Sequence, residues 1–410
     1  MLRVFYKIVM VKLGLEVLDL NFSKRMNYFN TGIFSVLATM KQEKVNMGMK
    51  IVDLSVGTPN IPPAQHIIDA LAESAQEKTN YIYALNDTTE LQDAVSQWYH
   101  RRYGVDIDAK TEMVSLLGSQ DGLCHISLAI VDPGDLVLVQ DPAYPIFSGG
   151  PVLAGAQLYL MPQKKENDYI IDLKAIPEEV AQKAKFMIVS YPNNPVTSIA
   201  PPSFYRELIA FAKKYDIIVL HDNAYSELVF DGKKCGSFLE YEGAKDVGVE
   251  FNSLSKTYGM AGARIGFALG NAQVISMLKS LKSNMDYGMF LPIQKAAVAA
   301  LTGPQDCVES TRLAYQKRRD VLVEGLNAIG WQIEKPKATM FVWAKIPDPF
   351  TSSETFTKEL LEKAGVLVTP GSAFGPSGEG YVRMALVQNE EEMKSAIQSI
   401  DKSGILNQKI

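Results

Sequence analysis

Residues 253–264 read SLSKTYGMAGAR, and the apolar, strand-like run IGFAL follows at residues 265–269. In this stretch Lys256 stands among small hydroxylic residues, and Arg264 comes eight positions later. A lysine amine forms a Schiff base with an aldehyde, and hydroxyls with a guanidinium are suited to holding a phosphate dianion. Pyridoxal phosphate (PLP) carries both an aldehyde and a phosphate on one ring. Because a lone lysine on a loop is more often a solvated charge, a cofactor site depends on what the rest of the chain contributes.

Length and composition suit a large core divided between two or three lobes. The chain has 410 residues, of which 47% are hydrophobic, and a net charge of -5. Its basic residues are dispersed, which argues against a nucleic-acid partner. The cysteines Cys124, Cys235 and Cys307 form no CxxC pair, and the four histidines show no ligand spacing. We therefore expect no disulfide framework, no metal site and a reducing, cytoplasmic setting.

The first 25 residues differ in character from the rest of the chain. They mix apolar residues with Arg3, Lys7 and Lys12, and their uncharged stretches are too short for a membrane span. A small-residue cleavage site is missing, so we expect no signal peptide. Met26 then opens a segment that reads like an ordinary start. We predict that residues 1–25 are an extension that folding does not need, and the alternative is an arm that packs on a partner subunit.

Residues 66–304 alternate helical patterns with short apolar runs, mostly rich in β-branched residues. Such runs are typical of strands that are covered on both faces. An amphipathic helix is predicted over 202–215, where prolines open the pattern and lysines stand towards its end. Strand, helix and strand at this spacing predict right-handed βαβ crossovers, an α/β fold and a mostly parallel sheet. The predicted strands lie at 113–117, 136–139, 186–189 and 217–220.

The pattern changes near residue 305, where we expect a smaller α+β domain to begin and to run to residue 410. We expect residues 26–65 to form an N-terminal arm that partly joins this domain, because 51–54 read as a lone strand ahead of the main domain. The smaller domain's helices are predicted at 311–329, 354–364 and 389–403, and its strands at 340–344 and 381–386.

Four ends of the predicted strands carry unusual polar residues, and ligands of parallel sheets bind at the carboxyl ends of strands. The first strand leads through Ser119 and Gln120 into a helix, whose N-terminal N–H groups suit a phosphate. Capping of the helix by Ser119 explains the same pattern equally well. The second end places Tyr144 between two prolines, which would hold its ring rigidly for stacking on a planar group. A tyrosine packed in a surface turn is the alternative there.

The other two strand ends supply an amide and a carboxylate. Asn194 lies in the segment YPNNP, where its amide could donate to a phenolate oxygen, although a plain turn accounts for the pattern too. Asp222 follows closely on four aliphatic residues, so its carboxylate needs a cationic partner. A protonated pyridine nitrogen would supply that cation, and a helix N-cap is the other interpretation. Tyr225 could reach the same ring oxygen as Asn194.

Together these residues resemble the motifs of the class I/II PLP-dependent aminotransferases, the aspartate-aminotransferase-like proteins of fold type I. The resemblance covers residues 30–405 and implies a three-layer αβα large domain. Lys256 matches the Schiff-base lysine, and Asp222 matches the partner of the pyridinium nitrogen. Asn194 and Tyr225 match the two partners of the ring oxygen, and Tyr144 matches the stacking aromatic. The matches to the phosphate-holding residues are Ser119, Gln120, Ser253, Ser255 and Arg264.

The resemblance extends to substrate binding. Residues 371–383, GSAFGPSGEGYVR, resemble the motif whose arginine clamps the substrate α-carboxylate, which is Arg383 here. From the residues alone Arg383 could also be a charge on an edge strand. Gly57 matches the glycine whose backbone contacts that carboxylate, beside Asn194. Tyr83 resembles the tyrosine that reaches the neighbouring subunit's phosphate, and Tyr81 competes for this role.

The family implies a ping-pong transfer of an amino group from an L-amino acid to a 2-oxo acid such as 2-oxoglutarate. Lys256 would act as the general base, with Asp222 and Tyr225 assisting, in a homodimer with shared active sites and no membrane or nucleic-acid partner. The sequence is most similar to the branch of LL-diaminopimelate and broad-specificity aminotransferases. It departs from the family where Asn-Pro-Thr-Gly becomes NPVT at residues 194–197. A carbon–sulfur β-lyase and a non-enzymatic sensor are the alternatives.

Overall fold

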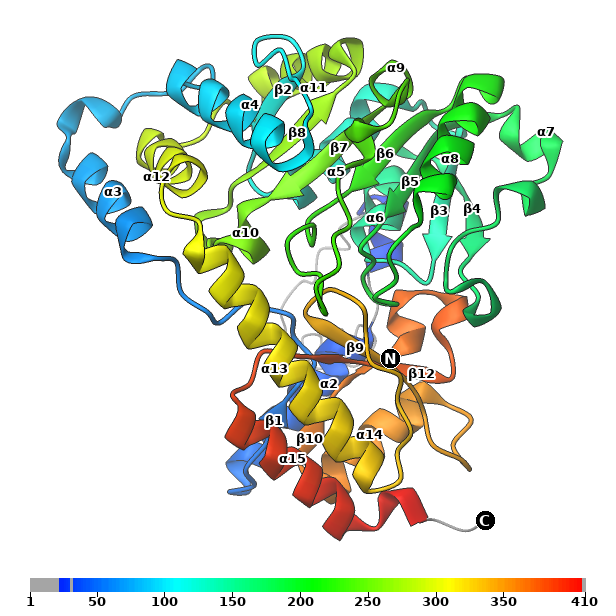
Figure 1. Cartoon of the computed structure of the whole chain (residues 1–410). Helices are drawn as coiled ribbons and strands as arrows, with labels where there is room; N and C mark the ends of the chain where they lie inside the picture. The colour runs from blue at the N-terminus through cyan, green and yellow to red at the C-terminus, as the bar shows by residue number, and fades with distance from the viewer. Residues whose placement is uncertain (1–21, 30–31, 408–410) are drawn as a thin grey trace, which may run out of the picture.

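The computed structural model describes residues 22–29 and 32–407, and most of the extension predicted at residues 1–25 lies outside this range. A large α/β part stands above a smaller α+β part, and the long helix α13 (Asp306–Ala328) runs between them (Figure 1). No helix in the described range is both long and apolar enough to cross a membrane.

The large part is built on a sheet of seven described strands in the order β2-β8-β7-β6-β5-β3-β4. Only β8 runs antiparallel to its neighbours, so the predicted α/β class and mostly parallel sheet are confirmed. The strands are β2 (Met113–Leu116), β3 (Leu136–Asp141), β4 (Gln157–Pro162), β5 (Ala184–Ser190), β6 (Ile218–Asp222), β7 (Gly248–Ser253) and β8 (Gly266–Gly270).

Alternate residues of these strands enter two separate cores on the two faces of the sheet. Val219 packs into one core and Leu220, the next residue of β6, into the other. This period of two places apolar side chains under helices on both faces, which produces three layers. One face is covered by α4 (Thr89–Tyr103), α8 (Pro202–Tyr215) and α12 (Leu291–Thr302), and the other by α5 (Ser119–Ile130), α6 (Ile146–Ala154) and α11 (Ala272–Met285).

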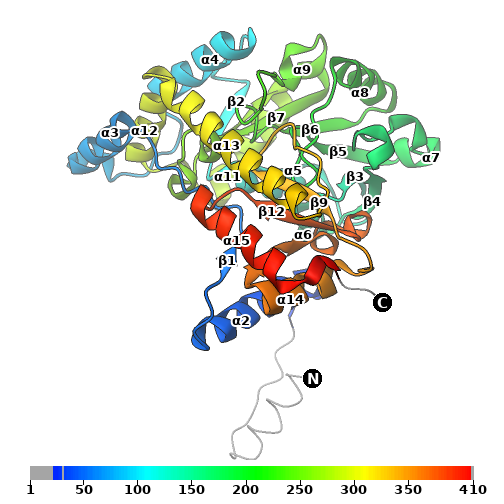
Figure 2. The same cartoon turned by 60° about the horizontal axis from the view of Figure 1, so that its bottom comes forward.

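The smaller part combines the N-terminal elements α2 (Gly32–Asn46) and β1 (Val52–Asp53) with the C-terminal part of the chain (Figure 2). Strand β1 pairs in parallel with β10 (Val366–Leu367), next to a sheet of the order β11-β12-β9. Because β12 is the middle strand of that sheet, Arg383 is not a charge on an edge strand. The remaining elements are β9 (Phe341–Lys345), α14 (Ser353–Ala364), β11 (Thr369–Pro370), β12 (Tyr381–Ala385) and α15 (Glu390–Ser403).

The helix predicted over 202–215 coincides with α8, whereas α13 starts five residues before its predicted beginning. At the N-terminal side, the 3-10 helix Lys24–Phe29 lies against α6, where the guanidinium of Arg25 donates to the carbonyl of Leu153 at 2.7 Å. The last residue of the predicted extension therefore contacts the large part. The limits of the domains stay predictions.

Candidate active site

A cavity of about 400 Å³ opens at the carboxyl ends of the parallel strands, between the large and the small part. Every site residue predicted from the sequence lines it, except Tyr83. The lining residues predicted in advance are Gly57, Ser119, Gln120, Tyr144, Asn194, Asp222, Tyr225, Ser253, Ser255, Lys256, Arg264 and Arg383.

One end of the cavity is suited to a phosphate. Helix α5 begins there, and its N-cap is Gly118 at φ 83 rather than Ser119, so the capping interpretation of Ser119 is wrong. A Cβ atom at Gly118 would collide with the guanidinium of Arg264, which lies directly beside it. That guanidinium donates to the carbonyl oxygens of Ala261 at 3.1 Å and Leu117 at 3.2 Å. Its charge is thus met by neutral groups only, and the helix N-terminus adds further donors.

The hydroxyl residues before Lys256 shape the short helix α10 (Leu254–Thr257). The Ser253 hydroxyl accepts from the N–H of Ser255 at 3.2 Å and so caps this helix. The helix directs Lys256 into the cavity, where its Nζ donates to the carbonyl of Gly57 at 3.3 Å. Burial, aided by the charges of Arg383 and Arg264, lowers the pKa of Lys256 to about 8. An amine with such a pKa is partly neutral near physiological pH and can act as a nucleophile or a base.

Asp222 is the last residue of β6 and is 5% exposed. Its Oδ1 accepts from the N–H of Ala224 at 3.2 Å, and no helix begins at this point, so the N-cap interpretation is wrong. Burial raises the pKa of Asp222 to about 6. Among the ion pairs of the described residues none includes Asp222. Such an acid suits a protonated ring nitrogen as its partner.

The sides of the cavity carry polar aromatic residues and an amide. The Tyr144 hydroxyl donates to Oε1 of Gln120 at 2.8 Å, which holds the ring at the cavity wall. Burial raises the pKa of Tyr225, so its phenol keeps its proton. Asn194 is 5% exposed and accepts a hydrogen bond from Nη1 of Arg383 at 2.9 Å. Its amide N–H₂ group remains available as a donor.

Arg383 is a buried cation between two aromatic rings. Its guanidinium carbon lies 4.1 Å from the ring centre of Phe341 and 4.6 Å from that of Phe374. Nη2 donates to the carbonyl of Ser55 at 3.0 Å, and Nε is buried without a partner among the described atoms. Burial lowers the pKa of Arg383 to about 10. A carboxylate ligand would supply the missing negative charge.

These neighbours of Arg383 were not predicted from the sequence. Phe374 lies within the motif at residues 371–383, so its position in the chain is a local signal. Phe341 and Ser55 come from segments far from that motif, and no local pattern marks them.

Tyr83 lies outside the cavity of its own chain. Its side chain is 81% exposed, and Tyr81 is 65% exposed beside it. The ring centres of Tyr83 and Tyr287 are 5.5 Å apart, whereas the Tyr81 hydroxyl donates to the carbonyl of Ala75 at 2.8 Å. The structure therefore does not bring Tyr83 to the phosphate end within one chain.

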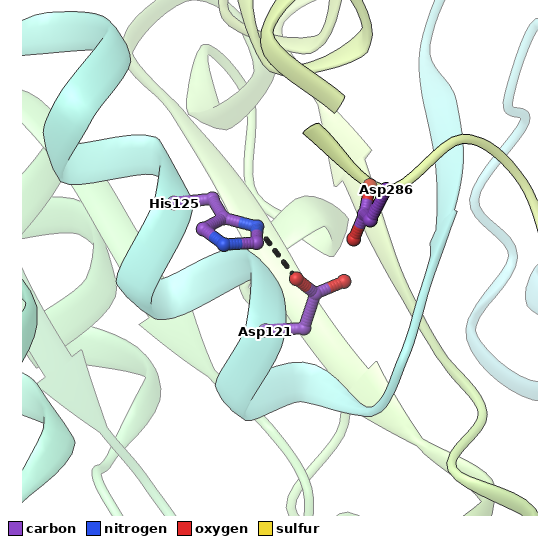
Figure 3. A group of neighbouring side chains, drawn as sticks. All are labelled: Asp121, His125 and Asp286. Atoms are coloured by element: carbon purple, nitrogen blue, oxygen red, sulfur yellow. Dashed lines mark ion pairs between the residues drawn. The ribbon is translucent and has the colours of Figure 1, made fainter. Parts of the chain in front are cut away.

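Asp121 and His125 of α5 converge with Asp286, which directly follows α11, and this grouping is of the kind that can hold a metal ion (Figure 3). Lys282 lies between the carboxylates, with its Nζ 2.7 Å from Oδ2 of Asp121 and 2.7 Å from Oδ2 of Asp286. Nδ1 of His125 lies 2.6 Å from the other oxygen of Asp121. The ammonium group occupies the place where a cation would bind, so we interpret this group as an internal ion cluster.

Comparisons with known proteins agree with this geometry. A family model described as aminotransferase class I and II matches residues 49–400. The chain is 46% identical to the LL-diaminopimelate aminotransferase of Moorella thermoacetica over 92% of this chain and 97% of that protein. It is similar to substrate-bound BacF from Bacillus subtilis, with 37% identity, a TM-score of 0.89 and coverage of 93% and 98%.

A Thermus thermophilus aspartate aminotransferase mutant matches with 25% identity and a TM-score of 0.87, over 94% of this chain and 100% of that one. The fold, the family model and the relatives agree with one another. The chain belongs to the class I and II aminotransferases, a PLP-dependent family of enzymes.

Proposed function

We propose that this aminotransferase takes the amino group of LL-diaminopimelate and passes it to 2-oxoglutarate. The main support for the reaction is the cavity, in which Asp222 and Arg383 are buried, Lys256 is half-buried, and none of the three forms an ion pair within the described residues. The support for the donor is that relatives with 42% to 46% identity carry the name LL-diaminopimelate aminotransferase.

The residues of the cavity fit PLP. Gly118 leaves room for Arg264 at the phosphate end, and the buried carboxyl of Asp222 forms no ion pair within the described residues. Ser119, Ser253 and Arg264 would hold the phosphate, and Tyr144 would pack against the ring. When bound, PLP supplies an electron sink for the bond broken at the substrate's α-carbon.

The chain's own groups would perform four tasks at the cofactor and the substrate. Asp222 would hold a proton on the ring nitrogen, because a buried carboxylate is stabilised by a cation. Asn194 and Tyr225 donate to the ring oxygen. Lys256 would hold the cofactor through its aldehyde group, and its amine would serve as the base for the proton at the substrate's α-carbon. Arg383, with the backbone at Gly57, binds the substrate α-carboxylate.

We further propose that the enzyme works as a cytoplasmic homodimer, without nucleic-acid or membrane partners. The support for a dimer is an exposed apolar patch, which a second copy of the chain would cover. The patch is formed by Tyr81, Ile82, Tyr83 and Phe290. In such a dimer Tyr83 could reach the partner's phosphate end, which it does not reach in its own chain. Sedimentation equilibrium tests this proposal. A monomer with full activity at the working concentration would contradict it.

The experiment that tests the donor is a half-reaction with purified enzyme and PLP. L-amino acids, LL-diaminopimelate among them, are added singly while the absorption of the bound cofactor is recorded. We expect LL-diaminopimelate to convert the cofactor fully to the amino form, and 2-oxoglutarate to restore the original spectrum. If another amino acid converts the cofactor faster, that amino acid is the preferred donor and the proposal of LL-diaminopimelate is wrong. Release of ammonia without an oxo-acid acceptor would indicate a lyase instead.

A further inference from the structure

The turn formed by residues 193–198, called here the Asn193 turn, carries a backbone conformation that its sequence disfavours. Thr197 stands where the family motif has glycine, and its φ is 63°. A β-branched residue is an outlier in this left-handed region because its side chain crowds the backbone. Something else in the structure must therefore hold the turn in place.

Asn193 is the residue that holds it. Its side chain is fully buried, and Oδ1 accepts from the N–H of Val196 at 3.1 Å. Its backbone carbonyl accepts from the N–H of Thr197 at 3.0 Å, and its own N–H donates to the carbonyl of Ser198 at 3.0 Å. These three hydrogen bonds close the turn around Thr197.

The amide nitrogen of Asn193 ties the turn to the ends of three parallel strands. Nδ2 donates to Oε1 of Gln140 at the end of β3 at 3.2 Å and to the carbonyl of Ser190 at the end of β5 at 3.1 Å. It also lies 3.3 Å from Oε1 of Gln163, which follows β4. Gln140 and Gln163 are 1% and 3% exposed, so this network is shielded from water. In such surroundings hydrogen bonds fix positions tightly.

The neighbour of Asn193 is the asparagine of the cavity. Asn194 accepts from Arg383 at 2.9 Å and lines the cavity with Lys256 and Tyr225. A shift of the turn would move this amide away from the guanidinium and from the position of the cofactor's ring oxygen.

We propose that Asn193 is a positioning residue that clamps the Asn193 turn against the strain at Thr197 and thereby fixes the amide of Asn194. Asn193 does not line the cavity, so it would act only through Asn194. This inference rests on the proposed role of Asn194, and it assigns a residue outside the cavity to the reaction.

The test compares Asn193→Ala, Asn194→Ala and the double variant. Three quantities are measured for each: the thermal midpoint, kcat/KM for the donor, and the pH midpoint of the bound cofactor's absorption. Asn193→Ala should lower kcat/KM at least tenfold and shift the absorption midpoint, because a hydrogen bond to the ring oxygen changes its proton affinity. In the Asn194→Ala background the same substitution should lower the thermal midpoint but cause no further loss of kcat/KM.

Asn327→Ala is the matched control. The Asn327 side chain also holds a turn, through two hydrogen bonds to the backbone of Ile333 at 2.6 and 3.1 Å, but it lies in the small part away from the cavity. It should lower the thermal midpoint and leave kcat/KM unchanged. If Asn193→Ala behaves like this control, the residue is structural only and the proposal is wrong. An equal loss of kcat/KM with and without Asn194 would also overturn it.

Thr197→Gly supplies a rescue. Glycine adopts a φ of this sign without steric cost, so the turn should keep its shape when the clamp is missing. Adding Thr197→Gly to Asn193→Ala should restore most of the lost kcat/KM, and no recovery would contradict the role given to the strain. If Asn193→Ala does not fold, Asn193→Asp replaces it, because that variant keeps the acceptor for Val196 and loses the donors. Wild-type enzyme that reacts with no donor would refute the proposed function, whereas the absorption midpoint would still test the clamp.

Discussion

Charges are compensated differently in the candidate active-site cavity and in the ion cluster formed by Asp121, His125, Lys282 and Asp286, called here the Lys282 cluster. Lys282 lies 2.7 Å from each of two carboxylates, so its charge is compensated within the chain. Lys256 donates only to a carbonyl, and the buried acid Asp222 has no cation bound to it. Burial therefore lowers the pKa of Lys256 to about 8 and raises that of Asp222 to about 6.

The difference separates a structural ion cluster from a binding site. Charges that stabilise the fold are paired, because an uncompensated buried charge is costly. Charges left without partners remain available to a ligand, and the pKa values of such groups are perturbed. Lys256, Asp222 and Arg383 belong to the second kind. Replacing Lys256 and Lys282, one at a time, by neutral residues tests this comparison.

Lys256→Ala should have the largest effect. The proposed function makes Lys256 both the group that binds the cofactor's aldehyde and the base at the α-carbon, so kcat should fall by at least roughly 10³-fold. Retention of some cofactor through the phosphate end is expected and can be measured by dialysis and absorption. Full activity in this variant would rule out the assignment of Lys256.

Lys282→Met should damage stability instead of chemistry. It leaves the buried carboxylate of Asp121 and the half-buried carboxylate of Asp286 without the ammonium group, which should cost about 2–4 kcal/mol of unfolding free energy. Denaturant unfolding measures this loss, and kcat is expected to stay within a few-fold of the wild type under folding conditions. A large loss of kcat with unchanged stability would show that the two regions are not distinct in the way described.

Arg383→Ala tests the substrate side of the cavity. Without the arginine the substrate's α-carboxylate would have no cationic partner. The transition-state stabilisation calculated from kcat/KM should therefore fall by about 2–5 kcal/mol. The affinity for PLP should change little, because Arg383 lies away from the phosphate end. The specificity constants of several amino acids check the first point, and PLP titration checks the second. Unchanged specificity constants for every donor would contradict the role of Arg383.

The smallest expected effect is on the pH dependence of the unfolding free energy, which tests the comparison through the pKa of Lys256. Lys256 loses its proton at about pH 8 in the folded apoprotein, whereas an unfolded lysine keeps it until about 10.4. In this window the unfolded state binds more protons, so stability should rise with pH, by about 1–3 kcal/mol in total. Unfolding of wild type and Lys256→Met from pH 8 to pH 10 measures it. The two curves should diverge, and parallel curves would mean that the amine titrates normally.

Much of the fold and of the cofactor side could be predicted because the relevant residues lie in short, local patterns. The helix over 202–215 and the polar residues Asn194 and Asp222 each follow from a few adjacent positions. Strand β7 was harder to predict because Glu250 and Asn252 interrupt its apolar pattern.

Features that depend on distant contacts could not be predicted in this way. Asp121 meets Lys282 only after α5 and α11 have packed, and Phe341 meets Arg383 through pairing of β9 with β12. The strain at Thr197 depends on a backbone angle that the altered motif alone does not reveal. The role of Tyr83 requires a second chain, so it stays a prediction.

The most direct test of the central claim is to find which lysine binds the cofactor. Enzyme loaded with PLP is treated with borohydride, which links a reacting amine permanently to the cofactor, and the labelled peptide is identified by mass spectrometry. The unpaired state of Lys256 predicts a single label on that residue and none on Lys282. A label on Lys282 or another lysine, with Lys256 unmodified, would contradict the account.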